Sequence, residues 1–200
     1  MPSEGIPHYL RQGIAFCILL VLKRRFDKYR DEGELPPELS ALIGMRLYNK
    51  PEHIKAWRNT PHGLHWVDGE GNLFHGAVDE LLDNSGTLVV LDFKTRGFPL
   101  KGDSTYYYQS QLDIYNLLIR NNGVPTEDFS YLLILHPTGI EAGRELEQRV
   151  TFQTDLVNMP ISVGHAEELF THAREILKGP MPQAAEKCRY CQYVANAPRA

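Results

Sequence analysis

Residues 76–94, Gly-Ala-Val-Asp-Glu-Leu-Leu-Asp-Asn-Ser-Gly-Thr-Leu-Val-Val-Leu-Asp-Phe-Lys, contain two short apolar runs separated by the turn-forming residues 83–86. This pattern predicts a β-hairpin. Because side chains alternate between the two faces of a strand, Asp92 and Lys94 point the same way and the residue between them points to the other side. The hairpin can bring Asp79 alongside them. The stretch therefore predicts two carboxylates and an ammonium group on one face of a sheet.

This group of charges has two interpretations. An Asp-x-Lys triplet also arises by chance, and an ion pair on an exposed sheet edge is the simpler alternative. Its position favours a site, because the triplet closes the apolar run 88–91 and Asp79 precedes it at hairpin distance. Converging carboxylates are unfavourable unless something lies between them, and a hard divalent cation is the simplest occupant. Glu80 should face the opposite side of its strand, so Asp79 and Asp92 are the candidate ligands.

The rest of the chain predicts further strands and helices on either side of this hairpin. The order is a helix, a run of strands, a helix, a strand pair and a last helix, which indicates an α/β (mixed α+β) fold with a central mixed β-sheet flanked by helices. The expected helices are 6–30, 52–58, 106–121 and 162–177, and the expected strands are 64–68, 72–82, 87–94, 129–135 and 149–152.

Length and composition fit a single domain over residues 1–200, with a helical N-terminal part (1–63), a core (64–178) and a tail (179–200). The hydrophobic content of 42% suffices for a sizeable core. The most apolar window, 14–22, is too short to cross a bilayer and is typical of a buried helix. Three cysteines, an odd number, argue against a disulfide scaffold, and we expect a reducing cytoplasm.

A net charge of −4 argues against broad electrostatic adhesion to nucleic acid, although a local basic groove remains compatible with it. One basic run has aromatic residues interleaved with it. It is either a solvated helix face or a surface that contacts phosphates. Its members are Lys23, Arg24, Arg25, Lys28 and Arg30, with Phe26 and Tyr29 among them.

The predicted helix 106–121 adds Gln111 and Tyr115, which are four residues apart and so share a helix face. They could hold a phosphate or a water beside the metal. The alternative is that Tyr115 is an ordinary, partly buried aromatic residue and Gln111 is its neighbour on the solvent side.

Taken together, Gly76-x-x-Asp79, Asp92-Phe93-Lys94 and Gln111-x-x-x-Tyr115 resemble the PD-(D/E)XK nucleases of the RecB type, in particular the CRISPR-associated exonuclease branch. The resemblance covers about residues 64–191, and the three motifs together are far more specific than any one. It implies a restriction-endonuclease-like core.

The resemblance also implies roles for these residues. Asp79 and Asp92 would bind Mg²⁺ or Mn²⁺ together with the main-chain carbonyl of Phe93. Lys94 would position or activate the attacking water and stabilise negative charge. The remaining pair, Gln111 and Tyr115, would contribute to the catalytic site.

The implied activity is metal-dependent hydrolysis of DNA phosphodiester bonds, as an exonuclease on single strands or DNA ends. The alternative is a catalytically weak nuclease-fold module that serves in nucleic-acid binding or assembly. Presence of the five candidate side chains favours the enzyme, because a binding module has no need of the full set.

The tail carries Cys188-Arg189-Tyr190-Cys191, a pair that can chelate one soft metal. Relatives in the resembled branch often hold an iron–sulfur cluster with one N-terminal and three C-terminal cysteines. With three thiols, this chain cannot supply four, so either another ligand completes an iron–sulfur or zinc site or none is bound. Cys17 lies in an apolar run, where a small buried hydrophobe is the expected role.

Overall fold

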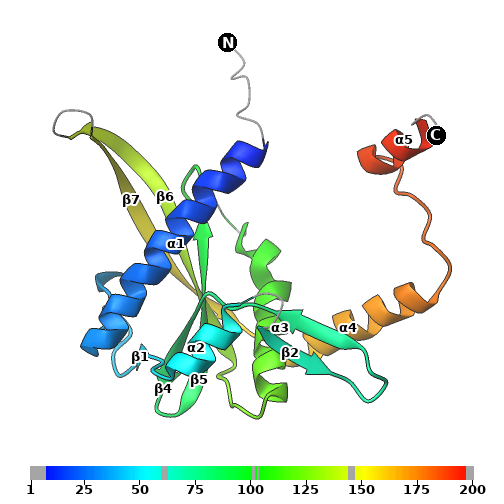
Figure 1. Ribbon diagram of the computed structural model, residues 1–200, viewed down its shortest axis with the longest axis horizontal. Helices are drawn as coiled ribbons and strands as arrows, with labels where there is room; N and C mark the ends of the chain where they lie inside the picture. Colours follow the sequence, from blue (N-terminus) through cyan, green and yellow to red (C-terminus); the bar gives the residue numbers. More distant parts are fainter. Residues whose placement is uncertain (1–7, 60–62, 101, 103, 144–146, 197–200) are drawn as a thin grey trace.

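A central sheet with helices on both faces organises the protein (Figure 1). The computed structural model describes residues 8–59, 63–100, 102, 104–143 and 147–196, with side chains from residue 17 onward. Its five strands have the order β1-β4-β5-β6-β7, with β5 and β6 parallel and the other neighbours antiparallel. The strands are β1 (Arg46–Leu47), β4 (Glu80–Asn84), β5 (Thr87–Thr95), β6 (Phe129–Ala142) and β7 (Gln148–Pro160). The expected mixed sheet flanked by helices is therefore confirmed.

The predicted hairpin is present as β4 and β5, joined by the two-residue turn Ser85–Gly86. Both turn residues have positive φ, 55° at Ser85 and 99° at Gly86. Two positive φ values define the turn whose twist matches that of paired strands. The turn fixes the register, with Asn84 opposite Thr87 and Glu80 opposite Leu91.

The predicted single strand 72–82 is wrong. It is broken into β3 (Leu73–Gly76), which pairs with β2 (Leu64–Val67) in a separate two-stranded sheet, and β4 of the central sheet. Residues 77–79 make the transition, and the Val78 amide donates to the Trp57 carbonyl at 3.0 Å. A Cβ at Gly76 would lie 2.9 Å from the Tyr115 ring, so the chain crosses closely over that side chain. Asp79 consequently lies just before β4 rather than within a strand.

Each face of the central sheet carries its own apolar core. On one face, α1 (His8–Glu32) contributes Leu22 and Phe26, which pack with Phe93 and other side chains of the sheet. On the other face, α3 (Gln109–Asn121) contributes Leu112, Leu118 and Tyr115. Successive residues of β5 therefore enter opposite cores, as the alternation predicts.

The smaller helices complete these layers. The short α2 (Pro51–Trp57) matches the predicted helix 52–58, and α4 (Val163–Lys178) begins at Ser162, whose side chain accepts from the His165 amide at 3.2 Å. The start of the predicted helix 106–121 is a 3₁₀ helix, η2 (Ser104–Tyr108), which runs into α3. Another 3₁₀ turn, η1 (Pro37–Leu39), follows α1. The tail contains α5 (Arg189–Asn196), which the sequence did not predict.

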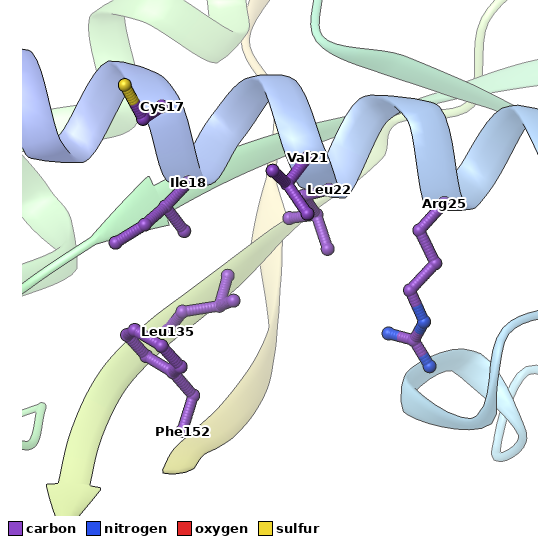
Figure 2. Close-up of a pocket in the computed structure, with 7 residues that line it drawn as sticks. All are labelled: Cys17, Ile18, Val21, Leu22, Arg25, Leu135 and Phe152. Carbon is purple, nitrogen blue, oxygen red and sulfur yellow. The ribbon is translucent and has the colours of Figure 1, made fainter. Parts of the chain in front are cut away.

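Strands β6 and β7 are longer than expected and form a ribbon that projects from the sheet (Figure 1). An apolar pocket of about 310 Å³ lies between this ribbon and α1, where Ile18, Val21 and Leu22 project toward Leu135 and Phe152 (Figure 2). Cys17 and Arg25 complete its lining. None of these seven residues belongs to the candidate catalytic set, which faces the other core.

The expectation of a buried helix at 14–22 is wrong for several of its described side chains. Leu22 is buried, but Leu20, Val21 and Cys17 are exposed, because this half of α1 extends past the sheet. Cys17 is therefore not the buried hydrophobe expected. In the part of the chain that the structure describes, no helix has the length and apolar character needed to cross a bilayer.

Candidate active site

Strand β5 presents Asp92 and Lys94 on the face covered by α3. The intervening Phe93 packs on the opposite face against Phe26, with 4.9 Å between ring centroids. The Lys94 ammonium forms an ion pair with the Asp92 carboxylate. The prediction that Asp92 and Lys94 share a face is confirmed.

Asp79 reaches the same place from the segment before β4. Its Oδ2 accepts a hydrogen bond of 3.0 Å from the Phe93 amide, which lies between the two residues of the triplet. Its Oδ1 is 2.8 Å from the Lys23 ammonium of α1. Its main-chain carbonyl accepts from Arg58 Nε at 2.9 Å. Asp79 is thus fixed at both its side chain and its backbone.

A chain of hydrogen bonds joins the triplet to α3. Lys94 Nζ donates to Gln111 Oε1 at 2.8 Å, and Gln111 Nε2 donates to the Tyr115 hydroxyl at 2.6 Å. The Tyr108 ring lies beside the lysine, with 5.1 Å from its centroid to Nζ. All five candidate side chains are therefore brought together, and Gln111 is a direct partner of Lys94 rather than a solvent-side neighbour.

Asp92 is the most strongly perturbed carboxylate of this group. It is 1% exposed. Burial raises its pKa to about 6, and repulsion from Asp79 adds to this, while attraction by Lys94 acts in the opposite direction. Its Oδ2 is buried and, although paired in charge with Lys94, has no well-directed hydrogen bond within the described residues. Such an oxygen is poorly satisfied by the protein alone.

Tyr115 remains a neutral phenol at physiological pH. Burial raises its pKa to about 12, and the nearby Asp92 and Asp79 charges act in the same direction. It can therefore position Gln111 through its hydroxyl but is poorly suited to act as a general base near neutrality.

The donor set fits a hard divalent cation. Asp79 and Asp92 supply carboxylate oxygens next to the main chain of Phe93, and Mg²⁺ and Mn²⁺ prefer oxygen ligands. Asp92 Oδ2, which is buried and already paired in charge with Lys94, is an oxygen that a cation would also contact. Within the described ranges, no three side chains of His, Cys, Asp or Glu gather at one point.

Sequence reasoning missed three neighbours of the site: Lys23, Arg58 and Tyr108. Lys23 belongs to the basic run, but nothing in its spacing singled it out from the other cations. Carboxylates take up the charges of Lys23, Arg25 and Arg30, whereas Arg24 and Lys28 are exposed on the surface of α1, so only part of the run is a solvated face. Lys23 pairs with Asp79, Arg25 with Glu38, Lys28 with Glu32, and Arg30 with Asp27 and Glu80.

Lys23 occupies one oxygen of a candidate metal ligand, so replacing it should ease metal binding. We expect Lys23→Met to tighten Mn²⁺ binding by roughly two- to fivefold, the range for a partly exposed ion pair. Titration calorimetry would measure this, with Lys28→Met as the control because Lys28 pairs only loosely with Glu32, at 3.8 Å, on the surface of α1. Weaker binding in Lys23→Met would show instead that Lys23 holds Asp79 in place.

The cysteines lie outside this group. Cys188 and Cys191 face each other, with 2.6 Å between their Sγ atoms, and hydrogen bonding with Cys191, whose amide donates to Cys188 Sγ at 3.2 Å, lowers the pKa of Cys188. Cys17 lies on α1, and the described part of the chain shows no group of three potential ligands that includes it. The pair could supply two soft ligands, half of a tetrahedral site.

Comparison with known proteins gives one match. The family model for the PD-(D/E)XK nuclease superfamily matches residues 21–195. Neither the curated proteins nor the solved structures contain a significant match to the chain. The matched range includes every residue of the candidate site described above.

Proposed function

Because the chain belongs to the PD-(D/E)XK nuclease superfamily, we propose that it is a divalent-metal-dependent deoxyribonuclease that hydrolyses phosphodiester bonds. One observation carries this proposal. The Phe93 amide holds Asp79 beside Asp92, while Lys94 is tied to α3 through Gln111. Carboxylates for a cation and an ammonium group for the phosphate thus meet at the end of one strand.

Asp79, Asp92 and the main-chain carbonyl of Phe93 would hold Mg²⁺ or Mn²⁺. When bound, such an ion lowers the pKa of a water ligand and neutralises the charge of phosphate oxygens. The raised pKa of Asp92 reflects a buried charge that needs a positive partner, which supports this assignment.

Lys94 would orient the attacking water and stabilise charge on the phosphate. An ammonium group has three donors. One is directed to Gln111 and another contacts Asp92, which leaves a third for substrate or water. The Gln111–Tyr115 hydrogen bond limits the positions that Lys94 can take.

We expect Lys94→Ala to lower the cleavage rate at saturating metal by about 10²- to 10³-fold, the scale of losing one transition-state donor. Metal affinity should change much less, because Lys94 is not a ligand. Rates on a labelled oligonucleotide and Mn²⁺ titration would separate the two effects, with Lys178→Ala as the control since Lys178 pairs with Glu70 outside the site. A loss of metal affinity as large as the loss of rate would contradict this role.

The finer assignment is an exonuclease of the RecB-like branch that acts on single strands or DNA ends in the cytoplasm. The three spaced motifs support the branch, and the free state of all three cysteines is compatible with a reducing compartment. An iron–sulfur cluster or zinc at Cys188 and Cys191 stays a prediction, because it needs ligands beyond that pair.

The second candidate function is a nuclease-fold module for nucleic-acid binding or assembly, favoured by the incomplete cysteine set and the net charge of −4. Digestion of single-stranded and double-stranded DNA with Mg²⁺, Mn²⁺ or a chelator separates the two. Metal-dependent cleavage of either substrate supports the enzyme. Retained DNA binding with no cleavage of any substrate would favour the module.

A further inference from the structure

Three large aromatic side chains are exposed just beyond the catalytic strand. Tyr107 is 81% exposed, Tyr106 76% and Phe98 54%. Phe98 lies in the loop after β5, and the two tyrosines belong to η2, which leads into α3. Exposed aromatic rings that gather in one region commonly mark a binding surface. We call these three side chains the aromatic platform.

The aromatic platform adjoins, along the chain, a residue that contacts Lys94. Tyr108, next in the chain to Tyr107, places its ring centroid 5.1 Å from Lys94 Nζ. Because consecutive Cα atoms are about 3.8 Å apart, the exposed tyrosines begin within one or two residues of a contact to the catalytic lysine. The Tyr106 and Tyr107 rings lie edge to face, with centroids 6.0 Å apart.

Arg96 fastens the platform to the end of β5. Its amide donates to the Leu135 carbonyl at 2.9 Å, and its guanidinium donates to the Ser104 hydroxyl, at the start of η2, at 2.8 Å. The same guanidinium lies over the Phe98 ring, 4.9 Å from its centroid. A cation therefore accompanies the rings at the end of β5.

We propose that the aromatic platform binds unpaired bases of a DNA strand by stacking, and so selects single-stranded DNA for the adjacent site. Every base has an aromatic face that exposed tyrosine and phenylalanine rings can stack on, whatever the sequence. In a duplex those faces are already stacked on neighbouring base pairs. Arg96 supplies the positive charge for the backbone between the bases. This inference rests on the proposed nuclease function and adds the surface that would hold the single strand beside the site.

The test measures binding without cleavage. Fluorescence anisotropy with a labelled single-stranded oligonucleotide, in a chelator, compares the wild-type protein with Tyr106→Ala/Tyr107→Ala and Tyr106→Phe/Tyr107→Phe. We expect the alanine pair to raise the Kd by roughly 25-fold or more, because stacking on one ring contributes about five- to a hundredfold in affinity and the variant removes two rings. The phenylalanine pair keeps both rings and should bind within about threefold of wild type. Tyr190→Ala, at an 86% exposed ring of α5, should have no effect.

An abasic oligonucleotide of the same length tests the stacking itself. Wild-type protein should lose on it at least what the alanine pair loses on the normal strand. The alanine pair, which keeps only the Phe98 ring of the platform, should distinguish the two strands much less than wild type does. A blunt duplex of the same sequence should show little difference among the variants. All four proteins should unfold at similar temperatures, because the substituted rings are exposed.

Several results would overturn the inference. The inference is wrong if the Kd of the alanine pair for single-stranded DNA is unchanged, or if the pair loses as much affinity for the duplex. It is also wrong if wild-type protein fails to bind single-stranded DNA. Cleavage assays keep this apart from the proposed function. If the protein cleaves DNA with metal and the alanine pair binds single-stranded DNA as tightly as wild type, the stacking inference is wrong and the nuclease proposal stands. If binding depends on stacking but no substrate is cleaved, the stacking inference stands and the nuclease proposal is wrong.

Discussion

Asp92→Asn should reduce metal-dependent cleavage by about a thousandfold or more, equivalent to about 4 kcal/mol of transition-state stabilisation. Asp92 is 1% exposed and has a buried oxygen without a well-directed hydrogen bond, so its charge is the feature that a cation needs most. The amide of asparagine keeps the size of the side chain but loses that charge. Cleavage rates across a Mn²⁺ titration would measure the loss, and the same titration should show no metal-dependent rise in unfolding temperature.

The pH dependence of the stability of the metal-free protein provides the control for this variant. The pKa of Asp92 is raised from its ordinary 3.8 to about 6, so the folded state binds more protons than the unfolded state between these values. Stability from this group is present at low pH and is lost as the pH rises through that window. In a chelator, Asp92→Asn should therefore gain stability relative to wild type between pH 4 and pH 7. Cleavage that survives in Asp92→Asn would contradict the assignment of Asp92 as a ligand.

The sequence was most informative where local chemistry is decisive. Positive φ at Ser85 and Gly86 and the alternation along β5 follow from a few adjacent residues, and they place Asp92 and Lys94 correctly. The four-residue spacing of Gln111 and Tyr115 likewise survives any change in how the helix packs.

The errors came from packing between distant segments. The break between β3 and β4 depends on the Tyr115 ring lying against Gly76 and on the hydrogen bond from Val78 to Trp57, neither of which is visible in the local pattern. The full length of the β6–β7 ribbon depends on pairing between the exposed second half of β6 and the exposed first half of β7. The approach of Lys23 to Asp79 joins segments 56 residues apart in the sequence, 79 − 23 = 56.

Glu80 illustrates how the fold supports the site from the opposite side. As the neighbour of Asp79 in the chain, Glu80 is expected to face away from it, and it is fully buried. Its carboxylate accepts from the Arg58 guanidinium at 2.6 Å and pairs with that of Arg30. Since Arg58 also donates to the Asp79 carbonyl, the buried Glu80 helps to fix a candidate metal ligand. Glu80 is a positioning residue, acting through Arg58.

Glu80→Ala should destabilise the protein by about 3–5 kcal/mol, because removing one partner of a buried ion pair leaves the other charge buried without compensation. The side chains of Arg30 and Arg58 are only 6% and 13% exposed, so water cannot readily replace the carboxylate. Asp27 still pairs with both arginines, which places the expected loss toward the lower end of that range. Urea unfolding would measure it.

Glu70→Ala is the matched control for this loss. Glu70 also pairs with two cations, Arg174 and Lys178, but its side chain is 55% exposed, and we expect its loss to change the stability far less than the loss of Glu80. In the Glu80 variant, the folded fraction should also cleave more slowly at limiting metal and recover at high metal, since Asp79 would be less firmly held. Equal stability losses in the two variants would mean that solvent reaches the Glu80 network. A rate deficit that persists at saturating metal would mean that Glu80 acts on more than the position of Asp79.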